Sequence, residues 1–324
     1  MKLQLLTFSL IVSVLAGNSQ AQTLPPPDAQ GWMKLFRGNN TSDFYSHTTA
    51  GQTNGAFPSA TFGVRGDTVQ VSGTPTGHFA YKLNFSRYHI RYRIRHVTSG
   101  NGGMLLHVRE ADPSLGVYPR SLECQGDNVQ GYGELWTISA VFVNVKIASL
   151  TGARIYSPTG TEVTHGDPDG RRCQGSSKPF HGLNAWDTIE AIVYGADSIR
   201  QIVDGVTTIF YTKARISDAE NPSDFTRPLD RGRIVWQSEG SQVWYHNMEI
   251  KLFPGDSLYS SVYLDYQKRY GMRERSKSDQ LLLAKDGSLR FQGLSDVDYF
   301  RDLRGRNQSS SFLNISALRS TKLK

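Results

Sequence analysis

Hydrophobic and polar residues alternate through most of the chain. The stretch His89–Arg95 is typical, because Ile90, Tyr92 and Ile94 are apolar and the residues between them are basic. Successive side chains of a β-strand point to opposite faces, so this alternation predicts strands with one buried face. Turn residues separate the runs, and helical periodicity is nearly absent before Pro254. The pattern predicts an all-β protein, either a sandwich or a barrel.

The predicted strands are short and follow one another closely. Asp204 and Gly205 stand between two apolar runs, and such a pair tolerates the positive φ of a two-residue hairpin turn. The strands expected from the alternation are Thr68–Ser72, His89–His96, Gly103–Arg109, Ser121–Gln125, Leu135–Ala140, Asp187–Tyr194, Ser198–Val203, Gly232–Gln237 and Val243–Leu252.

Several predicted strands carry polar pairs where a core strand would be apolar. Glu123 and Gln125 share one face of their strand, Gln237 and Glu239 share one face of another, and His107 follows an apolar run. Burying a charge without a partner is costly, so a core has little use for such pairs. If these strands are neighbours, the shared polar face is a candidate site.

Structural roles for the same residues remain open at this point. His107 is flanked by apolar residues, so it is either a core histidine bonded to a backbone carbonyl or a ligand or proton shuttle. Glu123 and Glu239 are either site residues or partners of Arg120 or Arg233 in salt bridges, because glutamate is rarely buried unpaired.

The two ends of the chain differ from the middle. Residues 1–21 have Lys2, an apolar run and a small-residue ending, which is the pattern of a secretory signal peptide. We therefore expect a secreted or periplasmic protein without a membrane span, because no later segment reaches about 18 apolar residues. A proline-rich lead-in at 22–30 and a β domain at 31–254 follow, and then a basic tail at 255–324 that we expect to be partly disordered or helical.

Charge and cysteine content narrow the function classes. Most of the excess positive charge, formally +7 in all, lies in residues 255–324. Its arginines do not form the clustered, aromatic-rich face of a nucleic-acid binder, so we expect no nucleic-acid partner. Export makes a disulfide between Cys124 and Cys173 an open alternative, and the oligomeric state is open as well.

Five blocks of the chain, in the same order, resemble the exported 3-keto-disaccharide hydrolase family, also described as 3-keto-glycoside lyases. The blocks are Gly31–Gly38, Gly100–Val108, Tyr118–Gln125 with Gly131–Trp136, Trp186–Glu190 with Val203–Gly205, and Ile234–Gly240 with Val243–Ile250. The chain departs from the family pattern at Gly102 (Ser in the family), Glu134 (Asp), Asp187 and Asp204 (Asn), and His246 (Arg).

The resemblance implies a concanavalin-like two-sheet β-sandwich, or jelly roll, with a carbohydrate cleft. It also implies cleavage of glycosides whose sugar carries a ketone at C3. That ketone acidifies the hydrogen on C2, so a base removes it, the C1 substituent departs, and water then adds. The substrate would be an oligosaccharide or glycoside.

The residues implied for this chemistry are those of the polar face. His107, Glu123 and Glu239 would form the proton-transfer centre and would also hold a divalent cation of the Ca or Mn type. Gln125, Gln237 and Trp136 would bind the substrate. A non-catalytic carbohydrate-binding module or a surface interaction module is the alternative, because sandwich folds host both roles.

Overall fold

The computed structural model describes residues 23–109, 117–129, 131–166, 171–175, 180–217, 226–263, 281–283 and 289–291. The expected signal peptide, 1–21, and most of the basic tail lie outside these ranges. By its internal contacts the chain divides into two compact units, Met1–Ser260 and Ser261–Lys324. In the second unit the described strands are β20 (Leu281–Leu283) and β21 (Leu289–Phe291), which pair antiparallel.

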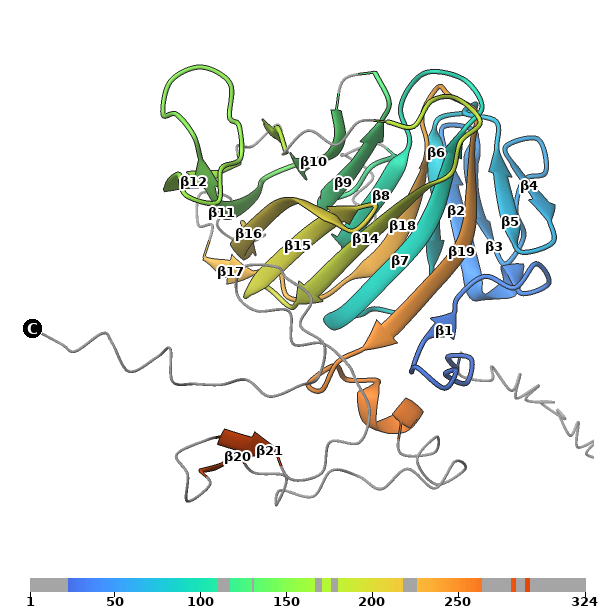
Figure 1. Cartoon of the computed structure of the whole chain (residues 1–324). Coiled ribbons are helices and arrows are strands. Elements are labelled where there is room, and N and C mark those ends of the chain that lie inside the picture. The colour runs from blue at the N-terminus through green and yellow to red at the C-terminus, as the bar shows by residue number, and fades with distance from the viewer. Residues whose placement is uncertain are drawn as a thin grey trace, which may run out of the picture. The chain divides into compact units, whose positions relative to one another are not determined.

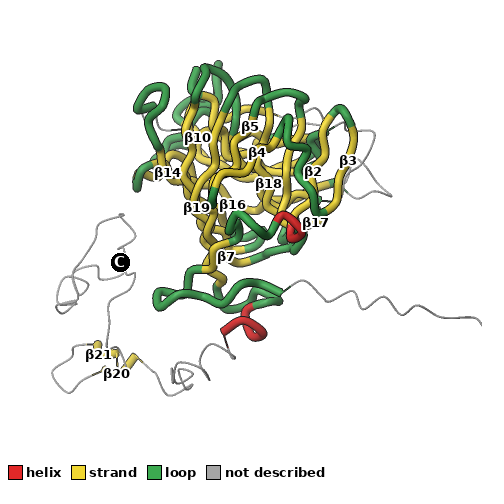
Figure 2. Tube along the Cα trace, turned by 90° about the vertical axis from the view of Figure 1, so that its right-hand side faces the viewer, coloured by secondary structure: helices red, strands yellow, loops and turns green. Residues whose placement is uncertain are grey.

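The first unit consists of two antiparallel sheets packed face to face (Figure 1). Figure 2 shows the strands joined by loops at their ends. The first sheet has the order β12 (Thr161–His165), β11 (Val141–Ile147), β16 (Val206–Ile216), β15 (Ser198–Val203), β14 (Asp187–Tyr194), β7 (Arg87–His96), β19 (Val243–Leu252), β5 (Thr68–Val71) and β4 (Phe62–Arg65). In addition, β1 (Met33–Lys34) pairs with β19 and β17 (Arg227–Pro228) pairs with β16.

The second sheet carries the polar residues singled out in the sequence. Its order is β13 (Arg171–Cys173), β10 (Gly131–Ile138), β9 (Ser121–Asp127), β8 (Gly103–Val108), β18 (Arg233–Ser238), β6 (Gly77–Tyr81), β2 (Phe44–Thr48) and β3 (Gly51–Asn54). A 3₁₀ turn, η1 (Thr41–Asp43), precedes β2. The predicted all-β, two-sheet sandwich is thus confirmed.

The space between the sheets is filled by aromatic and aliphatic side chains. Trp236 of β18 stacks on Phe79 of β6 with ring centroids 5.4 Å apart, and Tyr92 of β7 meets Trp236 edge-on at 6.3 Å. All three side chains are buried. Such rings contribute more apolar burial per residue than other side chains, so removing one from a core costs about 3–5 kcal/mol.

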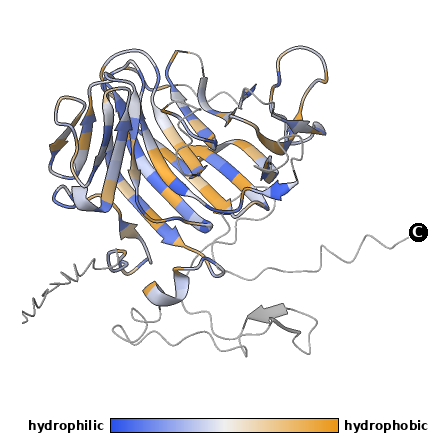
Figure 3. Cartoon of the chain, turned by 180° about the vertical axis from the view of Figure 1, so that it is seen from behind, coloured by the Kyte–Doolittle hydropathy of each residue, from blue (hydrophilic) through white to orange (hydrophobic). Residues whose placement is uncertain are grey.

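The alternation predicted for His89–Arg95 is confirmed by burial along β7. Its residues alternate between half-buried and buried positions, and Ile90, Tyr92 and Ile94 face the core. Figure 3 shows the same alternation of hydrophilic and hydrophobic positions along the strands. On the outer face of the first sheet, three arginines of β7 each cover a tryptophan. These pairs are Arg91 over Trp32, Arg93 over Trp186 and Arg95 over Trp244.

Local chemistry sets the turn between β15 and β16. Asp204 has φ 46° and Gly205 has φ 77°, so both occupy the left-handed region that a two-residue hairpin requires. The hairpin predicted from this Asp-Gly pair is present. Cys124 and Cys173 are both buried and both free. They lie on β9 and β13, on either side of Leu135 of β10, so they form no disulfide in this structure.

No helix in the described residues has the length and apolar content needed to cross a membrane.

Candidate active site

Two glutamates from different strands meet at one amide group on the outer face of the second sheet. Glu123 lies on β9, Gln237 lies on β18, and Glu239 follows β18 directly. Gln237 Nε2 donates to Glu123 Oε1 at 3.0 Å and to Glu239 Oε2 at 3.0 Å. The two hydrogens of a single amide therefore hold both carboxyl groups beside each other.

A glycine on the strand between β9 and β18 makes this meeting sterically feasible. Gly103 of β8 lies opposite Gln125 of β9, and the neighbouring Met104 lies opposite Trp236 of β18. A Cβ added at Gly103 would lie 2.8 Å from Gln237 Oε1. Because Gly103 has no side chain, the side chain of Gln237 reaches across β8 to Glu123.

Burial and mutual repulsion set the protonation of the two acids. Burial, followed by the charge of Glu239, raises the pKa of Glu123 from 4.5 to about 8, although the hydrogen bond from Gln237 lowers it. Burial also raises the pKa of Glu239, and hydrogen bonds from Asn101 and Tyr118 oppose that shift. At neutral pH Glu123 therefore carries a proton. Glu239 receives hydrogen bonds from Asn101 and Tyr118 that favour its charged form, whereas the charge of Glu239 disfavours ionisation of Glu123. Two neighbouring carboxyl groups in such different environments are suited to separate acid and base roles.

Two tyrosines that were not among the predicted site residues, Tyr118 and Tyr245, contact Glu239 or the strand that carries Gln237. Tyr118 donates its hydroxyl to the carbonyl oxygen of Ser238 at 3.1 Å, and it also bonds Glu239. Tyr245 reaches from the first sheet and donates to the carbonyl oxygen of Gln237 at 3.0 Å. The sequence pointed to Tyr118 only through its place in the family-like block Tyr118–Gln125, which also contains Glu123. The hydrogen bonds to both glutamates come from neutral side chains, which differs from the predicted alternative of arginine salt bridges.

Further polar atoms on this face have no hydrogen-bond partner among the described residues. Trp136 of β10 lies directly opposite Glu123, and its indole Nε1 is buried and unpaired. The same holds for Gln125 Oε1, Gln237 Oε1 and His78 Nε2, all buried. Buried polar groups in proteins are nearly always hydrogen-bonded, so these atoms have hydrogen-bonding capacity left for water or a polar ligand. The structure thus brings Gln125, Gln237 and Trp136 to the two glutamates.

His107 is placed elsewhere, because β8 contains a bulge. Leu105 pairs with Val235, whereas Val108 pairs with Arg233, so β8 has one residue more than β18 in this interval. His107 accommodates the extra residue with φ 52°, which turns its side chain to the opposite face of the sheet.

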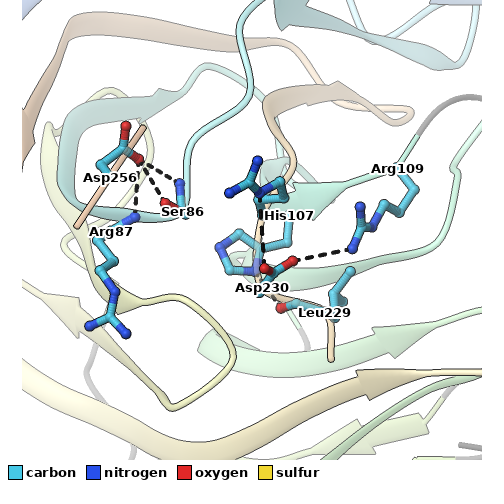
Figure 4. Close-up of polar contacts among 8 residues, drawn as sticks. Ser86, Arg87, His107, Arg109, Leu229, Asp230 and Asp256 are labelled. Atoms are coloured by element: carbon cyan, nitrogen blue, oxygen red, sulfur yellow. Dashed lines mark hydrogen bonds and ion pairs between the residues drawn. The ribbon is translucent and has the colours of Figure 1, made fainter. Parts of the chain in front are cut away.

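His107 is fully buried, and Figure 4 shows it beside Leu229 and Asp230. Its Nδ1 lies 2.8 Å from the carbonyl oxygen of Leu229, and its ring packs edge-on against Tyr88 of the first sheet. Burial lowers the pKa of His107 from 6.5 to about 4, so the ring is neutral at neutral pH. The geometry matches a core histidine bonded to a backbone carbonyl. The structure therefore does not bring His107 to Glu123 and Glu239, as the resemblance had led us to expect.

The predicted metal ligands do not form a ligand set, because His107 faces away from the two glutamates. In the described part of the chain, one other group of three ligand-type side chains comes close together: His181, Asp187 and Asp204. Asp187 begins β14, and Asp204 lies in the turn between β15 and β16. His181 bonds Asp187, and a side-chain hydrogen bond also joins Tyr132 to the buried Asp187 carboxyl group. One imidazole and two carboxylates suit a divalent cation.

Comparison with known proteins assigns the chain to a family. No curated protein matches it. A candidate glycosyl hydrolase from Parabacteroides distasonis has a TM-score of 0.45 and 16% identity, over 69% of this chain and 95% of that one. A β-glucanase from Bacillus licheniformis has a TM-score of 0.38 and 9% identity, over 68% and 97%. The carbohydrate-binding module CBM66 from Bacillus subtilis has a TM-score of 0.34 and 9% identity, over 68% and 94%. Residues 31–251 match the family described as 3-keto-alpha-glucoside-1,2-lyase-like domains, and the chain belongs to this family.

Proposed function

We propose that this protein cleaves 3-keto-glycosides by elimination followed by addition of water, and that it does so after export. One observation carries the proposal: Glu123 and Glu239 are held by one amide, and burial raises the pKa of Glu123 to about 8. An elimination of this kind needs a base for the C2 hydrogen and an acid for the departing oxygen. Family membership supports the choice of substrate.

The two glutamates divide the elimination between them. The Glu239 carboxylate removes the proton from C2, and the electron pair of that bond becomes the enolate of the C3 ketone. As the enolate reforms the ketone, a double bond forms between C1 and C2 and the C1–oxygen bond breaks. Glu123 gives its proton to the departing oxygen. Proton transfer from positioned carboxyl groups of this kind contributes typically about 10²–10⁴-fold to a rate.

Addition of water returns both residues to their starting states. The Glu123 carboxylate takes a proton from water as the oxygen bonds to C1, and protonated Glu239 returns a proton to C2. The net result is hydrolysis of the glycosidic bond. The unpaired indole N–H of Trp136 lies opposite Glu123 and is a suitable donor to the enolate oxygen.

We place any bound divalent cation at His181, Asp187 and Asp204, not at the two glutamates. There it would neutralise two carboxylates and tie the start of β14 to the turn between β15 and β16. Its contribution would be structural, and the acid–base steps above do not depend on it.

Direct hydrolysis of an unoxidised glycoside is the second candidate, because paired carboxyl groups are also the machinery of ordinary glycosidases. The decisive experiment offers the mature protein matched pairs of glucosides, one oxidised at C3 and one not, and follows release of the C1 substituent. We expect turnover of the oxidised member alone, with transient ultraviolet absorbance from the unsaturated keto sugar. Cleavage of the unoxidised member would establish the second candidate. Binding of both sugars without turnover would make the protein a carbohydrate-binding module.

A further inference from the structure

A recess lies away from the two glutamates, toward the β3 edge of the same sheet. It is a pocket of about 500 Å³ bounded by β2, β3 and the ends of β6 and β18. Its lining residues are Tyr45, Gln52, Thr53, Asn54, Lys82 and Arg233. None of them takes part in the Glu123–Gln237–Glu239 group, so the proposed chemistry leaves this pocket unexplained.

The lining combines an aromatic wall, two amides, a hydroxyl and two cations, and it includes no acidic residue. Lys82 Nζ donates to the carbonyl oxygen of Ser42 at 2.6 Å, so a neutral acceptor holds the ammonium group in place. The Arg233 guanidinium lies over the Tyr45 ring at 5.4 Å, and its Nε donates to the carbonyl oxygen of Lys82 at 3.3 Å. The pocket therefore presents positive charge from two positioned side chains beside a flat ring.

The pocket opens on the same sheet face as the two glutamates. Pairing across the sheet joins Tyr45 to Ala80, Ala80 to Val235, Val235 to Leu105 and Leu105 to Glu123. Residues paired in this way point to the same face. Four strand spacings of ~4.8 Å place Tyr45 about 19 Å from Glu123, measured across the strands. A ligand that reaches both places must contain several sugar units.

We infer that this pocket binds a negatively charged sugar unit, carrying a carboxylate or a sulfate, of an oligosaccharide whose reacting unit lies at Glu123. The inference rests on the proposed function for the position of the reacting unit. Guanidinium and ammonium groups recognise such anions through charge-assisted hydrogen bonds. Gln52 and Asn54 supply amides for the hydroxyl groups of the sugar.

The test measures binding by calorimetry on the full mature protein, with oligosaccharides of equal length. One ends in neutral glucose, one in a uronic acid and one in a sulfated sugar. We expect the anionic ligands to bind more tightly than the neutral one, with a preference that shrinks as salt is raised. Lys82→Gln should weaken binding of the anionic ligands about tenfold and leave the neutral one unchanged, as loss of a hydrogen bond between charged groups does. Tighter binding of either anionic ligand supports the inference, and the two together show which anion is preferred.

Lys251→Gln is the matched control, because Lys251 is also half-buried but lies on β19 of the first sheet. It should bind all three ligands as the unmutated protein does, and melting temperatures check that both variants fold. Equal affinity for neutral and anionic ligands would overturn the inference. So would a Lys82→Gln variant that loses the same affinity for the neutral, uronic-acid and sulfated ligands. Because binding is measured without turnover, anionic preference in a protein that cleaves no 3-keto-glycoside would leave this inference standing and refute the proposed function.

Discussion

At the residue scale, the distinctive feature is an acid kept protonated at neutral pH next to another acid. Burial disfavours the charged form of Glu123, and the nearby Glu239 disfavours it further. Gln237 limits that shift and fixes the positions of both carboxyl groups. Three side chains from β9 and from the end of β18 therefore determine the protonation on which the proposed reaction depends.

Replacing either acid by its amide removes proton transfer while keeping the shape of the side chain. We expect Glu123→Gln and Glu239→Gln each to lower kcat on a 3-keto-glucoside by about 10²-fold or more. Glu162→Gln, on the exposed strand β12, is the control and should retain full activity. If both glutamate variants turn over the substrate at the normal rate, the reacting groups lie elsewhere.

The pH dependence of kcat should be bell-shaped. The acid role of Glu123 requires its proton, so activity should fall as the pH rises through about 8. The base role of Glu239 requires ionisation, so activity should also fall at low pH, with a midpoint above 4.5 because burial raises the pKa of Glu239. Rate profiles from pH 4 to 10 measure both limbs. An alkaline limb that persists unchanged in Glu123→Gln would assign that limb to another group.

At the element scale, the bulge in β8 decides which side of the sheet His107 occupies. The parity of a strand predicts faces only while the ladder is regular, and one extra residue reverses it. His107 is consequently bonded to Leu229 in the core, and Tyr88 packs against its ring.

We expect His107→Ala to act on stability and not on chemistry. It leaves a cavity and an unpaired carbonyl at Leu229, so unfolding free energy should fall by about 2–4 kcal/mol. The kcat per folded molecule should stay within a few-fold of the unmutated value. Denaturant titration together with active-fraction measurement separates the two effects. A kcat loss as large as that of Glu123→Gln, with unchanged stability, would instead place His107 in the reaction.

The hairpin between β15 and β16 allows a test of backbone strain alone. Gly205 has φ 77°, and a Cβ added there would meet no atom within 4 Å. Gly205→Ala should therefore cost about 1–2 kcal/mol through conformation, without a steric clash. The control is Val206→Ala, at the exposed residue next to Gly205, and it should shift the unfolding midpoint less than Gly205→Ala does. Equal effects in the two variants would mean that the turn relaxes at little cost.

At the scale of the whole molecule, buried histidines link stability to pH. Burial lowers the pKa values of His78, His96 and His107 from 6.5 to about 4. The unfolded chain therefore binds more protons below pH 6.5, so this stability is present above 6.5 and is lost as the pH falls through about 4. Glu123 acts in the opposite sense, because its stabilisation is present below 4.5 and is lost as the pH rises through about 8.

Three imidazoles outweigh one carboxyl group in the acidic range. The melting temperature should therefore fall steeply between pH 6.5 and 4, and it should fall more gently between pH 6.5 and 8. In Glu123→Gln the decline on the alkaline side should be reduced. Calorimetric scans across this range measure both slopes. A melting temperature that rises between pH 6.5 and 4 would show that these histidines are not held neutral in the folded protein.

Much of the fold was predictable from the sequence, because it depends on neighbours along the chain. The alternation at His89–Arg95 predicted the buried face of β7, and Asp204-Gly205 predicted the hairpin. Parity likewise predicted that Glu123 and Gln125 share a face. These features follow from backbone geometry and side-chain polarity over a few residues.

Tertiary structure alone decided how the site is assembled. The meeting of Glu123 and Gln237 depends on β8 lying between their strands, with Gly103 leaving the space for it. The side on which His107 lies depends on a bulge that appears only when β8 pairs with β18. The pKa of Glu123 depends on burial and on a charge far away in sequence. Strand order, register and desolvation arise from contacts between distant segments, which a local pattern of residues does not encode.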